Sequence, residues 1–198
     1  MKIQNYEFKD DEKNDFVQFK DFMPDRCFRM LICAPSGGGK TNLLLDMIYR
    51  LLFFDKIYLY ARNLSQSKYK HLFKSFEPIS KEVGYDVIEA SNDDIIPLTD
   101  LSDENQKLVI FDDYLNTGKK NERIRDYFTN SRNKNCCYIY LSQSYYGTDK
   151  TIRLNSVVLI ARFGKENQKH KNVNYSVLLF YRFHNSFDSN IYNNNFCF

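Results

Sequence analysis

The sequence predicts an α/β fold in which a mostly parallel central sheet carries helices on both faces. Short apolar runs that suit buried parallel strands recur along the chain and alternate with segments of helical periodicity. A Gly-rich turn joins the first apolar run to the first helical segment. The chain has 198 residues, of which 43% are hydrophobic, and this length suits one domain with a sizeable core.

The chain is expected to divide into two parts. Residues 1–25 are polar with scattered aromatic side chains, so we expect an N-terminal arm that packs on the core and ends near Pro24. Residues 26–198 are expected to form a single domain. The net charge of +3 is too small to indicate a nucleic-acid partner by itself, and no apolar run is long enough to cross a membrane. The five cysteines show no zinc-binding spacing.

The first strand and the first helix flank the Gly-rich turn. Residues 28–33 form a short apolar run that suits a strand. The helix over about 40–52 is predicted by apolar residues at helical spacing, namely Leu43, Leu44, Met47, Ile48, Leu51 and Leu52. The turn between them reads Ala34-Pro35-Ser36-Gly37-Gly38-Gly39-Lys40-Thr41. A strand, a Gly-rich turn and a helix in this order are the context that a nucleotide-binding P-loop requires.

The residue types of this turn suit a bound polyphosphate. Three consecutive glycines let backbone N–H groups approach phosphate oxygens closely, and the positive end of the helix dipole faces them. Lys40 is predicted to reach the β- and γ-phosphates, and the Thr41 hydroxyl is predicted to bind Mg²⁺. The usual pattern begins with Gly where this chain has Ala34, which is a mild change in a turn. The alternative, a Gly-rich hairpin before an ordinary helix, leaves the Lys-Thr pair unexplained.

The segment after the first helix is expected to continue the alternation of strands and helices. We expect a strand, a loop, a helix and a short strand at residues 56–61, 62–66, 67–76 and 86–88. Residues 90–105 hold Pro97 and many acidic side chains, so they are expected to form a loop with a helical turn.

A second informative stretch covers residues 108–113. Four apolar residues followed by Asp112 and Asp113 suggest a buried strand whose tip emerges at the two acids. In P-loop ATPases the first such acid holds Mg²⁺ through water, and a second acid can act as the general base on the attacking water. We therefore assign the metal role to Asp112 and the base role to Asp113. Asp is shorter than the Glu often found in the base role, so the water must lie closer or another side chain must help to place it.

The remaining elements lead to a glutamine at a strand tip. A helix near 119–130 precedes a buried strand at 136–143, which ends in Gln143. A glutamine in this place can contact both the γ-phosphate and the attacking water, whereas the simpler interpretation is a side chain that caps the strand end. Further strands are expected at 157–161 and 177–183, the latter antiparallel if it closes the edge of the sheet.

Three segments together resemble the genome-packaging ATPases of the FtsK–HerA superfamily, above all those of large DNA viruses, virophages and polinton-type transposons. They are residues 34–41, 108–113 and 132–146, and the resemblance covers most of residues 28–162. It implies a P-loop NTPase of the additional-strand type, in which one strand lies between the P-loop strand and the Asp-Asp strand. The implied sheet order is 5-1-4-3-2, which brings Gln143 between Lys40 and Asp112.

The resemblance also implies cofactors and partners. These are ATP and Mg²⁺, a homo-oligomeric ring of five or six subunits, double-stranded DNA bound without sequence preference, and a capsid protein or portal vertex. The implied location is the host cytoplasm or a viral factory, or the virion. Arg132 resembles the family's trans-acting arginine finger, and Arg153 and Arg162 are alternative candidates for that role. Arg132 could instead be a surface residue that pairs with a nearby acid such as Asp126. Basic residues near 119–125 are candidate DNA contacts, or else a solvated helix face.

Two other classes of function stay open. A P-loop kinase would need an Arg-rich substrate lid but neither the Asp-Asp tip nor the Gln strand, and a nucleotide-binding interaction module would need no catalytic acids. A GTPase would need an Asn-Lys-x-Asp motif, which the sequence lacks, and a two-domain helicase would need a second core, for which the chain is too short. The residues favour an ATP-driven DNA translocase that packages a viral or virus-like genome into a preformed capsid.

Overall fold

The computed structural model describes residues 28–50, 52, 54–92, 94–102, 104–114, 119–131, 134–156, 158–164, 175–183 and 186–190. The expected N-terminal arm, residues 1–25, lies outside the described residues. Over the described part of the chain, no helix is both long and apolar enough to cross a membrane.

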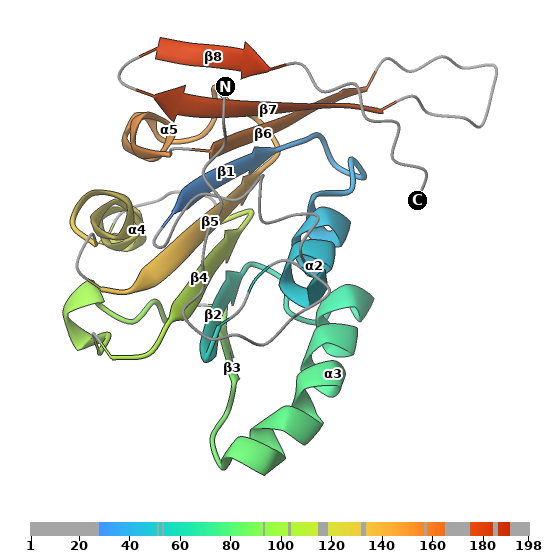
Figure 1. The fold of residues 1–198 in the computed structure, drawn as a ribbon, viewed down its shortest axis with the longest axis vertical. Helices are drawn as coiled ribbons and strands as arrows, with labels where there is room; N and C mark the ends of the chain where they lie inside the picture. The colour runs from blue at the N-terminus through green and yellow to red at the C-terminus, as the bar shows by residue number, and fades with distance from the viewer. Residues whose placement is uncertain are drawn as a thin grey trace, which may run out of the picture.

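One sheet organises the described residues (Figure 1). Its strand order is β3-β2-β4-β5-β1-β6-β7-β8. In chain order the strands are β1 (Arg29–Cys33), β2 (Lys56–Ala61), β3 (Ile88–Ser91), β4 (Lys107–Asp112), β5 (Cys136–Ser142), β6 (Val158–Gly164), β7 (Tyr175–Phe183) and β8 (Ser186–Asn190). The pairs from β3 across to β6 are parallel, and β7 and β8 add antiparallel pairs.

This topology confirms the predicted order 5-1-4-3-2. The five core strands of that order are β1, β2, β4, β5 and β6, and they lie as β6-β1-β5-β4-β2, with the short strand β3 beyond β2. The additional strand is β5, which pairs with the P-loop strand β1 on one side and with the Asp-Asp strand β4 on the other. The expected antiparallel strand is β7, but β8 pairs with its outer side, so β8 forms that edge.

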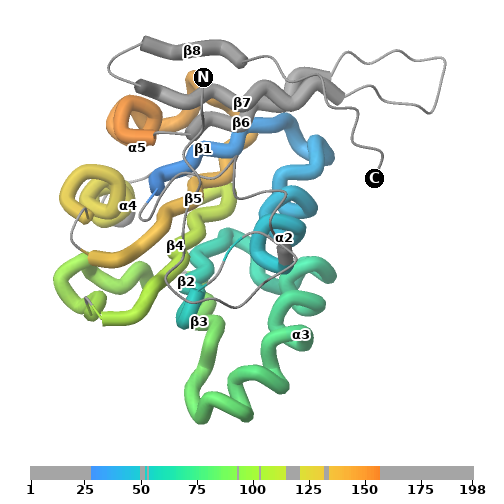
Figure 2. The backbone as a smooth tube through the Cα atoms, viewed as in Figure 1, coloured from blue at the N-terminus to red at the C-terminus, as the bar shows by residue number. Residues whose placement is uncertain are grey.

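Helices cover both faces of the sheet, as predicted (Figure 2). On one face lie α2 (Lys40–Arg50) and α3 (Ser67–Val83), and on the other lie α4 (Lys119–Thr129) and α5 (Lys150–Asn155). Strand residues alternate between the two faces, because successive side chains point to opposite sides of a strand. Thus Ile110 packs with the α2 and α3 side chains, whereas Phe111 packs with the aromatic rings of α4. The core therefore has two layers, one on each side of the sheet.

The parallel register aligns the carboxyl ends of the central strands. Cys33 of β1 lies opposite Ser142 of β5, and Asp112 of β4 lies opposite both Leu141 of β5 and Ala61 of β2. The chain segments that leave these strands must emerge at one edge of the sheet, which is where ligands bind in open α/β sheets. The Gly-rich turn, the acid pair, Gln143 and the loop after β2 thus lie at the same edge.

Several boundaries differ from the sequence-based expectations. Helix α3 continues past 76 to Val83, although Pro78 lies inside it, and it ends at Gly84, whose left-handed backbone (φ 80°) lets its N–H bond to the Ser80 carbonyl. Strand β3 begins at Ile88 rather than at 86, and α5 and β8 were not expected. The helical turn expected within 90–105 is present as a 3₁₀ turn at Leu98–Asp100.

Candidate active site

The three glycines of the turn are required for different reasons. Gly37 and Gly39 have φ values of 73° and 85°, in the left-handed region that side chains rarely adopt. Gly38 has no such φ, but a Cβ atom there would lie 2.8 Å from the Pro35 carbonyl oxygen and 2.9 Å from the Ala34 Cβ. Ala34 itself is buried, so the residue that departs from the usual Gly packs beneath the turn. Residues with a Cβ atom would therefore strain the backbone or clash at each of the three glycine positions.

Lys40 lies along its own turn. It is the first residue of α2 and is only 9% exposed. Its Nζ donates hydrogen bonds to the carbonyl oxygens of Ala34, at 2.8 Å, and Pro35, at 3.4 Å. The ammonium group is thus held by carbonyl groups at the base of the turn, beside the space where phosphates are predicted to bind.

Asp112 is the more buried acid of the pair. It ends β4, is 6% exposed, and accepts a hydrogen bond from the Tyr69 hydroxyl. Burial raises the pKa of the Asp112 carboxyl above its ordinary value, and the negative charge of Asp113 adds to this, while the Tyr69 hydrogen bond and the charges of Lys40 and Lys68 oppose it.

Asp113 occupies a different environment. Its backbone turns into the left-handed region at φ 51°, while its N–H donates to the Leu141 carbonyl at 3.1 Å. This conformation costs of order 1–3 kcal/mol for a residue other than glycine, and such positions cluster at functional sites. The half-buried carboxylate accepts a hydrogen bond from the side-chain amide of Gln143. The two adjacent acids therefore have different hydrogen-bond partners, Tyr69 for Asp112 and Gln143 for Asp113.

Gln143 completes the group because of the position of its strand. It directly follows β5, which lies between β1 and β4, so it emerges between the P-loop and the acid pair. The sequence-based expectation that Gln143 lies between Lys40 and Asp112 agrees with this placement, and its hydrogen bond goes to the second acid, Asp113.

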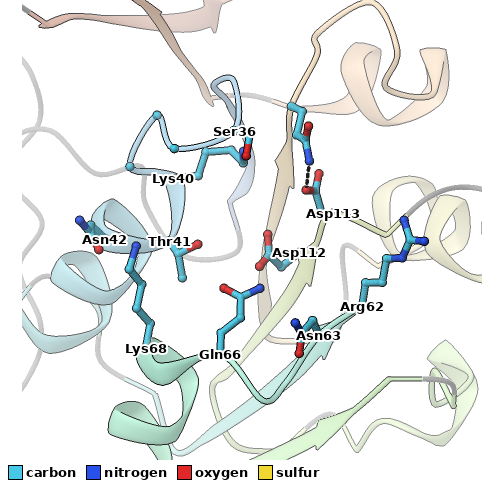
Figure 3. A pocket seen from close by; sticks show the side chains of 14 residues that line it. Ser36, Lys40, Thr41, Asn42, Arg62, Asn63, Gln66, Lys68, Asp112 and Asp113 are labelled. Atoms are coloured by element: carbon cyan, nitrogen blue, oxygen red, sulfur yellow. Dashed lines mark hydrogen bonds between the residues drawn. The ribbon is translucent and has the colours of Figure 1, made fainter.

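These residues surround a cavity of about 670 Å³ (Figure 3). The predicted site residues that line it are Ser36, Gly37, Gly38, Gly39, Lys40, Thr41, Asp112, Asp113 and Gln143. Ala34 and Pro35 are not among the lining residues, and their carbonyl oxygens instead hold the Lys40 amine. Lys40 and Thr41 face the two acids across the cavity in Figure 3. The predicted nucleotide-binding, metal and base positions are thus brought together.

Arg132 lies outside the described residues. The nearest described residues, Ser131 and Lys134, precede the amino end of β5 at Cys136, whereas Gln143 follows the carboxyl end. Its flanking chain is therefore at the opposite edge of the sheet from the cavity.

The sequence analysis missed a third side of the cavity, formed by the β2–α3 connection. This connection and the first turn of α3 contribute Arg62, Asn63, Gln66 and Lys68, and Asn42 of α2 is a further lining residue. Arg62 and Lys68 are exposed, and neither pairs with an acid among the residues that the structure describes. One signal could have indicated them, because the expected sheet order places the loop at 62–66 beside the Asp-Asp tip.

Two arginines that were candidate DNA contacts are engaged within the fold. Arg123 donates to the Ile95 carbonyl at 2.6 Å, and Arg125 forms a two-nitrogen contact with Asp149 at 2.6 Å and 3.0 Å. Asp149 also caps α5 by accepting from the Thr151 N–H at 2.7 Å. Their guanidinium groups link α4 to its neighbours in the fold.

The family model described as poxvirus A32 protein matches residues 16–180 of the chain. The chain belongs to the poxvirus A32 protein family. The match spans the P-loop, the acid pair and Gln143, so it includes every described element of the site. The predicted resemblance to viral genome-packaging ATPases is thereby confirmed, and this A32-family protein is an ATPase of the P-loop class. A comparison with curated protein sequences gives no match.

Solved structures share the fold of the A32-family chain. The genome packaging NTPase B204 from Sulfolobus turreted icosahedral virus 2, in complex with AMP, matches with a TM-score of 0.57 and 13% identity, over 82% of this chain and 96% of that chain. Its complex with ATP-γS gives 0.52 and 10% identity over the same shares. The N-terminal domain of zonular occludens toxin from Neisseria meningitidis gives 0.50 and 16%, over 85% and 94%. At these identities the likeness shows the fold.

Proposed function

We propose that this protein is an ATP-driven translocase of double-stranded DNA that packages a viral or virus-like genome into a preformed capsid. The observation that carries the proposal is the convergence of the P-loop, the acid pair and Gln143 on one cavity through the additional strand β5. Membership of the A32 family and the likeness to a genome packaging NTPase support it.

ATP is proposed to bind with its phosphates along the Gly-rich turn. The turn offers backbone N–H groups from the glycines and the amine of Lys40, and the N-terminus of α2 adds its dipole. Arg62 and Lys68, which also line the cavity, bring further positive charge. Three cationic side chains and two acidic ones thus line the cavity, a balance that suits a polyphosphate with a divalent cation.

The donor set at the cavity fits Mg²⁺. Thr41 offers a hydroxyl and Asp112 a carboxylate, and Mg²⁺ prefers oxygen ligands of this kind. Within the described ranges, no group of three or more His, Cys, Asp or Glu side chains is placed to hold a metal, so phosphate and water oxygens would supply the remaining ligands. When bound, the ion would neutralise charge on the phosphates.

Asp113 and Gln143 are proposed to serve the attacking water. The Asp113 carboxylate would accept a proton from the water, and the Gln143 amide, which already contacts that carboxylate, would orient it. Gln143 would thus be the second side chain that helps to place the water, which the short side chain of Asp113 requires.

DNA-stimulated hydrolysis tests the proposed function. We expect duplex DNA without any phosphate acceptor to accelerate ATP hydrolysis, because a motor couples hydrolysis to its track and a kinase does not. Binding measured by fluorescence anisotropy should be independent of sequence and fall steeply with salt, with each phosphate contact adding about −0.9 to the slope of log K against log salt. A kinase would need an acceptor, and an interaction module would not hydrolyse ATP. A marked preference for one duplex at fixed salt would contradict the proposed mode of binding.

The ring and its partners are part of the same proposal. We infer a head-to-tail homo-oligomer of five or six subunits that engages a capsid protein or portal vertex, in the host cytoplasm or a viral factory, or in the virion. Arg132 is proposed to reach the neighbouring subunit's γ-phosphate, since its flanking chain lies at the edge opposite its own P-loop. A planar, permanently charged guanidinium suits the charge that spreads over the phosphoryl oxygens.

Mixing two inactive variants tests the role of Arg132. Arg132→Ala keeps Lys40, and Lys40→Ala keeps Arg132, so a mixed ring contains interfaces at which both groups are intact. Random mixing in equal amounts restores about one interface in four in a head-to-tail ring, and ATPase activity should recover accordingly.

The matched control replaces the second partner with the Lys40→Ala/Arg132→Ala double variant, which supplies no intact arginine and should restore nothing. If assemblies shown to contain both single variants stay inactive, the arginine finger is another residue or is absent.

A further inference from the structure

We propose that Tyr69 is a positioning residue for the metal-binding carboxylate of Asp112. The inference rests on the proposed function, because it concerns the same Mg²⁺·ATP site. Tyr69 belongs to α3, a helix for which the sequence predicted no part in the chemistry. Its side chain is not among those that line the cavity.

The contact is specific and buried. The Tyr69 hydroxyl donates to Oδ2 of Asp112, across 43 positions of sequence, and Tyr69 is 0% exposed. Asp112 is 6% exposed, so water could not readily replace the Tyr69 hydroxyl if that hydroxyl were removed. The contact takes one carboxylate oxygen and leaves the other for a ligand at the cavity.

The position of Tyr69 is fixed by packing. Its ring belongs to the buried cluster between the sheet and the two helices α2 and α3, with Leu72 one helical turn further along. A phenol held on every side by core atoms has few rotamers, so its hydroxyl defines where the Asp112 carboxylate lies. Hydrogen bonds of this kind orient metal-binding groups, and losing one typically lowers metal affinity about 10–100-fold.

The adjacent residue strengthens the link between α3 and the site. Lys68 lines the cavity, and in Figure 3 its side chain extends from α3 toward Thr41 and Asn42. Successive residues in the first turn of α3 therefore serve the site from two sides, one from the open cavity and one from the core. A shift of α3 would move both, and with them the carboxylate that binds the metal.

The test removes the hydroxyl and keeps the ring. In Tyr69→Phe, we expect the Mg²⁺ concentration for half-maximal ATPase activity to rise about tenfold, while binding of ATP without metal stays unchanged. High Mg²⁺ should restore most of the rate. The matched control is Tyr127→Phe, since Tyr127 is equally buried and donates to the Ile96 carbonyl on the other face of the sheet. This control should shift thermal stability without shifting the Mg²⁺ dependence.

A second measurement separates positioning from general stability. In an Asp112→Asn background, Tyr69→Phe should cause no further change in Mg²⁺ dependence, because its effect acts through that carboxylate. An unchanged Mg²⁺ dependence in folded Tyr69→Phe, or an equal shift in Tyr127→Phe, would overturn the proposal. If the wild-type protein binds Mg²⁺·ATP without hydrolysing it, the proposed function fails, and the Mg²⁺ dependence of fluorescent-nucleotide binding still tests Tyr69.

Discussion

Lys40→Ala is expected to reduce ATP hydrolysis to the background of the assay, a loss of at least roughly 10²–10³-fold by analogy with the loss of one preorganised donor. The Lys40 amine lies at the Gly-rich turn, where the carbonyl oxygens of Ala34 and Pro35 hold it. Its removal leaves the charge that develops on the phosphoryl oxygens without its nearest counter-charge. Steady-state phosphate release with purified protein measures the effect.

A remote lysine provides the control for this loss. Lys81 is exposed and forms an i,i+4 ion pair with Glu77 on α3, so Lys81→Ala should leave turnover unchanged. Because Lys40 also contacts the turn itself, thermal unfolding and circular dichroism must show that the variant is folded. Wild-type turnover in folded Lys40→Ala would show that the turn does not serve ATP in this way.

Asp113→Asn is expected to slow hydrolysis by roughly 10²–10⁴-fold, the usual worth of a general base, while Mg²⁺·ATP binding remains. Asn tolerates the left-handed backbone at φ 51° and has the same shape, so the fold and the contact with Gln143 should persist. Asp112→Asn should instead weaken the binding of Mg²⁺, and with it the affinity for Mg²⁺·ATP. The two acids are adjacent and differ in environment, one buried against Tyr69 and one half-buried beside Gln143.

Calorimetric titration of each variant with Mg²⁺·ATP, beside single-turnover hydrolysis, distinguishes the two roles. The titration should show near wild-type affinity for Asp113→Asn and reduced affinity for Asp112→Asn. Equal loss of nucleotide binding in both variants would mean that the acids act as one electrostatic unit, and the separate assignments would be wrong.

The sequence predicted those parts of the fold whose signal is local or motif-based. The Gly-rich turn, the acid tip and the Gln strand lie in continuous segments with strong patterns, and resemblance then supplied the strand order that brings them together. The distal half of α3 was missed although Ile79 and Val83 continue the apolar spacing of the helix. A proline usually marks the end of a helix, and Pro78 lies between the predicted segment and these two residues, which are exposed.

The missed site residues share one physical cause. Arg62 and Lys68 are polar side chains in and after a loop, and nothing in their local sequence distinguishes them from ordinary solvated residues. Their place at the cavity follows from the pairing of β2 with β4, which is a long-range property of the sheet. The contact of Tyr69 with Asp112 is likewise long-range, so no local pattern indicates it. Short α5 has only six residues, and β8 is a polar edge strand, so neither carries a clear periodic pattern.

The left-handed backbone at Asp113 restricts which acid can serve as the proposed base at this position. Asp and Asn enter that region several times more readily than other residues with a Cβ, because their short polar side chains can bond locally. A Glu at the same position would gain reach toward the water but would meet the backbone penalty. Exchange between the two acids is therefore not a conservative replacement here. The length of the proposed base and the backbone turn that carries it therefore depend on each other, so a longer acid would fit only with a different turn.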